Sequence, residues 1–195
     1  MKAIDIIHAE HRALGAVLQA FGFILDEVRD GRLKPDFALL EAMIEYITEV
    51  PDKLHHPKED DVLFVALRAR IPQAGALIDK LQRDHAEGAQ HILELRDALR
   101  RYREEGEGGF QAFETTVRAY VATSWAHVGL EERELLPLAR KGLSREDWAG
   151  IDAAFEANKD PWSGPAGEFR SLFSRIVSMV PAPYGLGPSA GPAGL

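Results

Sequence analysis

The chain has 195 residues, 46% of them hydrophobic, and its excess of Asp and Glu over Lys and Arg gives a formal net charge of −8 at pH 7. This acidity argues against a nucleic-acid partner, which requires a basic face for its phosphates. The absence of cysteine excludes disulfides, thiolate metal ligands, iron–sulfur clusters and thiol nucleophiles. Helix formers dominate over residues that favour strands, so we expect one all-helical, all-α protein.

The sequence gives no sign of a secretory or membrane segment. Residues 5–12 are too polar for the apolar part of a signal peptide. No run approaches the roughly 20 apolar residues of a membrane span. We therefore expect a cytoplasmic protein with no membrane partner.

The first predicted helix ends at Asp30-Gly31 and has a regular apolar seam. Its inward positions recur at alternating steps of three and four and are Ile4, Ile7, His11, Leu14, Leu18, Phe21, Leu25 and Val28. This spacing is typical of a bundle helix. His11 lies inside the seam, where an imidazole costs free energy unless both ring nitrogens find partners.

The second predicted helix opens at Pro35 and runs to about Arg70. It carries His55 and Glu59 at the spacing H-x-x-x-E. In a helix this spacing places the two side chains about 40° apart around the axis and about 6 Å apart along it. One imidazole and one carboxylate can therefore face the same ion.

The third predicted helix repeats the first at a constant offset of 74 residues. Its seam consists of Ile78, Leu81, His85, Gly88, Ile92, Leu95, Leu99 and Tyr102. His85 again takes the third position, in the place of His11. The glycine-rich segment 105–109 then separates this helix from the next.

The fourth predicted helix, from about Phe110 to Lys141, corresponds to the second. Leu40, Ile44 and Ile47 match Phe113, Val117 and Tyr120 at an offset of 73. The offset falls to 72 at a second H-x-x-x-E motif, His127 to Glu131. The second helix thus carries one extra residue before His55, which we attribute to a kink or bulge near Pro51.

A short fifth helix is predicted from a capping pair, Ser144 and Asp147, to about Asn158. The tail beyond it is rich in Pro and Gly, apart from an amphipathic segment. The apolar positions of that segment are Phe169, Leu172, Phe173, Ile176 and Val180. We expect it to pack on the chain's own bundle or on a dimer partner, with a membrane or partner site as the alternative. The last dozen residues are expected to be disordered.

Four helices, each with an inward histidine, and two carboxylates together form a candidate metal site. The six predicted ligands are His11, His55, Glu59, His85, His127 and Glu131. Six protein donors exceed the four of a structural zinc site, and so many imidazoles are unusual for magnesium or calcium. The set suits iron, with manganese as the alternative. Two ions are favoured over one, because carboxylates on opposite helices can bridge them while two histidines cap each.

Two other histidines are open alternatives. His56 competes with His55 and pairs with Asp60 at the same spacing. We prefer His55, because only that register reproduces the motif at His127. His8 is expected to be an exposed helix histidine, with a role as an extra ligand or as a partner of a ligand as the alternative.

Four ordered motifs carry a resemblance to a known family. They are the segments 9–14 (AEHRAL), 55–64 (HHPKEDDVLF), 83–88 (RDHAEG) and 127–131 (HVGLE) followed by Leu135-Leu136-Pro137. Over residues 4–141 the chain resembles the hemerythrin-like, or HHE cation-binding, family. The resemblance implies an up-down-up-down antiparallel four-helix bundle. It also implies a non-heme di-iron centre with oxo or hydroxo and carboxylate bridges, which binds dioxygen or nitric oxide.

The chain departs from oxygen-carrying hemerythrin at two places. Those carriers have a second histidine four residues after the third-helix ligand, where this chain has Ala89, and His91 is expected to be solvated. They also use an Asp at the position of Glu132. The pattern is closer to the four-His, two-Glu site of iron-sensing and nitric-oxide-responsive relatives.

We therefore expect an iron-binding protein that binds dioxygen or nitric oxide, or that acts in storage, delivery or the sensing of iron, oxygen or nitrosative stress. We assign no separate catalytic residue. The alternative is a di-iron enzyme with oxidase, peroxidase or nitric-oxide-handling activity. We divide the chain into a bundle at 1–142, a packed helix at 143–160 and a tail at 161–195, whose amphipathic segment covers 168–180. A homodimer is considered as a further partner.

Overall fold

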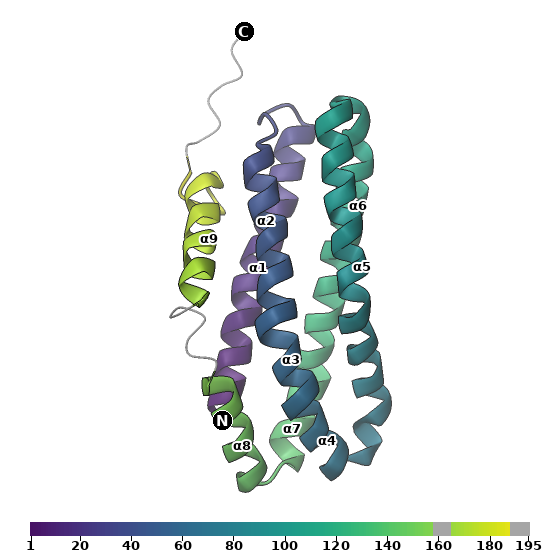
Figure 1. The fold of residues 1–195 in the computed structure, drawn as a ribbon, viewed down its shortest axis with the longest axis vertical. Coiled ribbons are helices and arrows are strands. Elements are labelled where there is room, and N and C mark those ends of the chain that lie inside the picture. The colour runs from purple at the N-terminus through teal and green to yellow at the C-terminus, as the bar shows by residue number, and fades with distance from the viewer. Residues whose placement is uncertain (158–164, 188–195) are drawn as a thin grey trace.

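The computed structural model describes residues 1–157 and 165–187, and the long elements of this part are all helices. Four helical stretches contact one another in a ring and run along the long axis of the molecule (Figure 1). They are α1 (Lys2–Arg29), the stretch from α2 to α4 (37–70), α5 (Gly75–Glu105) and the stretch from α6 to α7 (107–142). The all-helical prediction is confirmed. In Figure 1 each stretch begins at the end of the molecule where the previous one stops.

The second stretch is interrupted twice by wider, π-helical turns. It consists of α2 (Phe37–Val50), the π-helical turn η1 (Pro51–His55), α3 (His56–Lys58), the π-helical turn η2 (Glu59–Leu63) and α4 (Phe64–Arg70). The bulge predicted near Pro51 is therefore confirmed as η1. At about 100° per residue, the eight steps from Ile47 to His55 would turn an α-helix about 80° past two full turns. The wider turn absorbs this excess and lets His55 face inward.

The fourth stretch has one such turn, η4 (Glu131–Leu135), between α6 (Glu107–Leu130) and α7 (Leu136–Gly142). It matches η2 at an offset of 72 residues. Both H-x-x-x-E motifs therefore end on the first residue of a π-helical turn. The short 3-10 turn η3 (Pro72–Ala74) links α4 to α5.

Two predicted helix starts are wrong by two or three residues. The second helix begins at Phe37 rather than Pro35, because the Asp36 side chain accepts a hydrogen bond from Leu39 N at 3.0 Å and caps it. The fourth begins at Glu107 rather than Phe110, since Gly106 alone turns the chain, at a φ of 63°. Gly109 is then free to lie against α5.

The apolar core is divided into two clusters by the predicted ligands. One cluster includes Phe21, Met43, Ile47, Leu95 and Phe113, and the other includes Ile7, Phe64, Leu81, Leu135 and Phe155. Along every one of the four stretches, the inward histidine lies between the residues of one cluster and those of the other. A polar layer thus crosses the middle of the molecule.

Two further helices pack on the outside. The reciprocal cap of α8 (Arg145–Ala157) forms as predicted, with Asp147 N donating to Ser144 Oγ at 3.2 Å and Ser144 N donating to Asp147 Oδ2 at 2.9 Å. α8 contacts α1 and η2, and α9 (Pro165–Met179) contacts α2. Leu172, Ile176 and Val180 join the first apolar cluster. The predicted amphipathic segment thus packs on this chain.

Some predictions fall outside the described residues. They are the helix end at Asn158, the side chain of Phe169 and the part of the disordered tail that covers 188–195. Among the helices that are described, none has the length and apolar character needed to cross a membrane.

Candidate metal centre

The structure brings all six predicted ligand residues together at mid-length. His11 comes from α1, His55 from η1, Glu59 from η2, His85 from α5, and His127 and Glu131 from α6 and η4. They form two overlapping groups whose candidate donor atoms lie within 4.8 Å of one another. One group contains His11 and His55, the other contains His85 and His127, and both contain the two glutamates.

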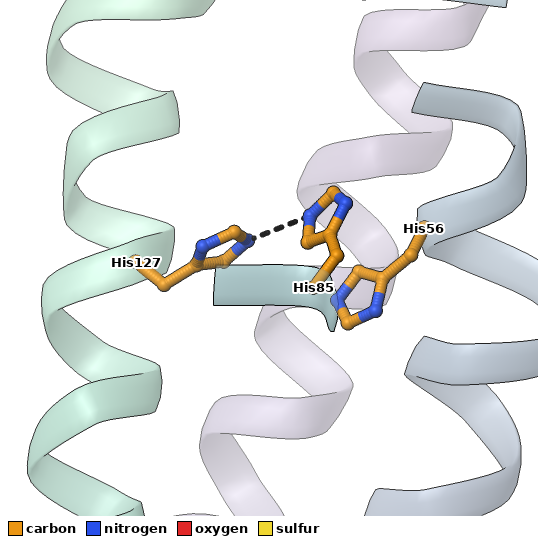
Figure 2. A group of neighbouring side chains, drawn as sticks. All are labelled: His56, His85 and His127. Carbon is orange, nitrogen blue, oxygen red and sulfur yellow. Dashed lines mark hydrogen bonds between the residues drawn. The ribbon is translucent and has the colours of Figure 1, made fainter. Parts of the chain in front are cut away.

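The histidines form two matched pairs. The Nε2 atoms of His11 and His55 lie 3.1 Å apart, and those of His85 and His127 are also 3.1 Å apart. Figure 2 shows the second pair, with the ring nitrogens of His85 and His127 pointing toward each other. Two nitrogen ligands about 2.0–2.1 Å from one metal ion lie about 3 Å apart when cis, so each pair has a suitable spacing.

Each glutamate directs one oxygen to each histidine pair. Oε1 of Glu59 lies 3.3 Å from His55 Nε2, while its Oε2 lies 3.7 Å from His85 Nε2. Oε2 of Glu131 lies 3.2 Å from His11 Nε2, and its Oε1 lies 3.2 Å from His127 Nε2. Such an arrangement suits two carboxylates that bridge two neighbouring cations.

A ring of outer carboxylates fixes the four imidazoles. The Nδ1 contacts are His11 to Glu132 at 2.8 Å, His55 to Glu10 at 2.7 Å, His85 to Asp60 at 3.0 Å and His127 to Asp84 at 3.4 Å. A carboxylate on Nδ1 holds the proton there and leaves the Nε2 lone pair for a metal. Each acid reaches from one stretch to the histidine of the next, so the contacts close into a ring.

Sequence reasoning missed this role for the four acids. Each stands directly beside a predicted ligand in the sequence but contacts the ligand of a different helix. A signal was present, because Glu10 and Asp84 are 74 residues apart, and Asp60 and Glu132 are 72 apart. These are the offsets of the ligands themselves.

The chemistry of the layer fits a cation. All four oxygens of Glu59 and Glu131 are buried and have no hydrogen-bond partner among the described residues. When each Nδ1–H donates to its carboxylate, the neutral rings also point Nε2 lone pairs at each other. Buried carboxylates and opposed lone pairs are unfavourable without a positive charge or protons between them.

The protonation states reflect this environment. Burial and the charge of Glu131 raise the pKa of Glu59 well above its usual 4.5. Burial lowers the pKa of His55 to about 4, and burial together with His56 lowers that of His85 to about 4. Burial opposes protonation of His11 and His127 too, yet contact with Glu131 raises the pKa of both.

The other histidines take different places. His8 Nε2 lies 3.0 Å from Glu132 Oε2, so it contacts the outer ring. His91 is half-buried and lines a cavity. His56 stacks on His85 with ring centroids 4.0 Å apart and an interplanar angle of 15° (Figure 2).

A cavity that is open to solvent reaches this layer. Its lining includes His56, Gly88, His91, Tyr120 and Ser124, in addition to the four paired histidines and Glu131. Gly88 is one of the inward seam positions, so its lack of a side chain contributes open space here. A small molecule can therefore reach the candidate metal site.

Comparison with known families gives one result. The family model of the hemerythrin HHE cation binding domain matches residues 2–139. No curated protein and no solved structure matches the chain.

Proposed function

The chain belongs to the hemerythrin HHE cation-binding family, and from this membership and the site geometry we propose that it holds a di-iron centre that binds dioxygen or nitric oxide. The ligands of one ion would be His11 and His55, and those of the other His85 and His127. Glu59 and Glu131 would bridge them. The proposal includes the up-down-up-down antiparallel bundle that is expected from the sequence.

The placement of the two glutamates carries the proposal. Each has its two oxygens directed at different histidine pairs, and all four oxygens are buried without a hydrogen-bond partner among the described side chains. One small cation would satisfy only part of this set. Two cations of charge +2 or more neutralise both carboxylates and separate the opposed Nε2 lone pairs.

Iron fits the donor types best. Four imidazoles and two carboxylates are borderline and hard ligands, and the chain contains no thiolate. Manganese is the alternative. When bound, iron would supply the redox chemistry and the attachment point for a diatomic ligand, while the chain's residues hold it and leave the cavity as the route of access.

We favour storage, sensing or delivery over turnover, because no organic substrate is suggested by the site. The cavity lining does support the enzyme alternative. His56 and Tyr120 place groups that can donate protons beside the candidate centre. Oxidase, peroxidase or nitric-oxide-handling activity would use such groups.

Reconstitution under anaerobic conditions tests the proposal. Ferrous iron is added to protein stripped with a chelator, and bound metal is measured by elemental analysis, with manganese as a competitor. We expect two iron ions per chain and preference for iron. One ion per chain, or none, would overturn the di-iron proposal.

Exposure of the loaded protein to ligand then separates the two functions. An absorption change that reverses on degassing supports binding of dioxygen or nitric oxide. Continuous loss of peroxide or nitric oxide at catalytic amounts of protein supports the enzyme. The domain division, the cytoplasmic location and the homodimer stay predictions.

A further inference from the structure

His56 breaks the repeat that relates the two halves of the site. The four paired histidines, the two glutamates and the outer acids all recur at offsets of 72 or 74 residues. At the offset of 72, the residue that corresponds to His56 is Val128. Both line the cavity beside the centre. One half of the site therefore has an additional imidazole where the other has an aliphatic side chain.

The additional imidazole belongs spatially to one pair. His56, His85 and His127 each offer a ring nitrogen, and these nitrogens lie within 4.8 Å of one another. The three rings gather at one place, with His56 against the face of His85 (Figure 2). The rings of His56 and His127 make an edge contact, with centroids 5.7 Å apart and an interplanar angle of 72°.

Coordination requires both an approach and a rotation of the His56 ring. Nitrogens that share one metal ion are about 3 Å apart, which the Nε2 atoms of His85 and His127 already satisfy at 3.1 Å. A third nitrogen within 4.8 Å needs to approach by about 2 Å, and the His56 ring must turn out of its stack on His85 so that this nitrogen faces the ion. His56 is half-buried at the cavity, so its ring has space on that side.

We propose that His56 is a third imidazole ligand for the metal position of His85 and His127. This inference rests on the two-metal centre proposed above. It makes the two positions unequal, because the position of His11 and His55 has no counterpart of His56. The ion at the three-histidine position binds more tightly, and the two-histidine position keeps more room for an external ligand.

Two substitutions separate a ligand from a packing residue. His56→Val places at 56 the residue that the repeat has at 128. His56→Phe keeps an aromatic ring to stack on His85 but has no donor nitrogen. His91→Val is the matched control, because His91 is a half-buried cavity histidine that lies outside the three-histidine group.

Anaerobic titration with Co²⁺, followed by calorimetry and by its visible absorption, provides the readout. We expect wild-type protein to bind two ions in two steps of different affinity. Both His56 variants should still bind two ions but lose about tenfold or more in the tighter step, with a change in the Co²⁺ spectrum. His91→Val should behave as wild type, and circular dichroism verifies that each variant is folded.

Wild-type affinities in both variants would overturn the assignment of His56, as would full recovery in His56→Phe, which would make the ring a packing group. Either result leaves the two-metal centre intact. Failure of wild-type protein to bind two Co²⁺ ions would instead count against the centre itself.

Discussion

Replacement of Glu59 by leucine should change stability in opposite directions with and without metal. Glu59 is 0% exposed and neither of its oxygens has a hydrogen-bond partner among the described residues. An unsatisfied buried polar group costs about 1–3 kcal/mol. Glu59→Leu removes this cost and adds an aliphatic side chain of similar size. We therefore expect the metal-free variant to be more stable than metal-free wild type by about 1–3 kcal/mol.

The effect is large enough to measure by thermal unfolding. For a protein of this size, 1 kcal/mol shifts the Tm by about 2–4 °C, so the metal-free variant should melt about 2–12 °C higher. With metal the order should reverse. A metal at about 100 times its Kd stabilises wild type by about 2.7 kcal/mol, and a variant that lacks one bridging carboxylate should lose most of that gain.

The assay is circular dichroism at increasing temperature, with excess chelator or with two equivalents of Fe²⁺ under anaerobic conditions. Asp61→Leu is the matched control, because Asp61 is an exposed acid in the same π-helical turn. Its effect should stay within about 0.5 kcal/mol. A metal-free Glu59→Leu protein that melts below wild type would refute the reasoning, since the carboxylate would then be favourable without a cation.

Three other predictions follow from the site and the fold. Glu10→Gln weakens the acceptor that lies 2.7 Å from His55 Nδ1, so the metal affinity measured by titration should fall about 10–100-fold. The control Glu41→Gln, on the exposed side of α2, should leave the metal affinity unchanged. Although burial opposes it, Glu131 raises the pKa of His11 and His127 above 6.5, so protons compete with metal for these rings. Metal loading near pH 7 should therefore release protons to a pH indicator, and metal affinity should drop as the pH falls toward 6. A metal affinity that does not depend on pH would contradict this. Gly109→Ala puts a Cβ 2.7 Å from Tyr102 Cα and should lower stability by about 1–3 kcal/mol in chemical denaturation, while Gly108→Ala, whose Cβ meets nothing within 4 Å, should be neutral or slightly stabilising.

The seams and the ligands were predictable because they repeat. His11 and His85 stand at the same step of two matched apolar patterns, and the two H-x-x-x-E motifs confirm each other's register. A pattern that occurs twice at one offset is a stronger constraint than any single histidine. The structure accordingly brings the six expected residues into one layer, although their binding of metal stays a proposal.

A feature that occurs at the same place in both halves of the sequence leaves no sign when the halves are compared. The turns η2 and η4 both begin at a predicted ligand, Glu59 or Glu131, so they produce no change of offset when the two stretches are compared. Only η1 is unmatched, and it alone left a visible slip near Pro51. The outer acids were missed for another reason, since their contacts cross between helices while sequence patterns report faces of one helix.

The wrong helix starts have a local cause. Apolar periodicity fixes the middle of a helix but not its first turn, which depends on capping. Asp36 moved one start later, and Gly106 moved the other earlier, because a single glycine at positive φ completes the turn.

The ring of outer carboxylates has a consequence for assembly. Its contacts alternate, with Glu10 to His55 inside the first helix pair and Asp60 to His85 between the first pair and the second. One helix pair therefore carries half of the predicted ligands and half of the outer carboxylates, on one self-complementary surface. Two copies of such a pair related by a two-fold axis would supply the whole set. A peptide of the first two stretches is thus expected to be a metal-driven homodimer, whose association strengthens as cations are added.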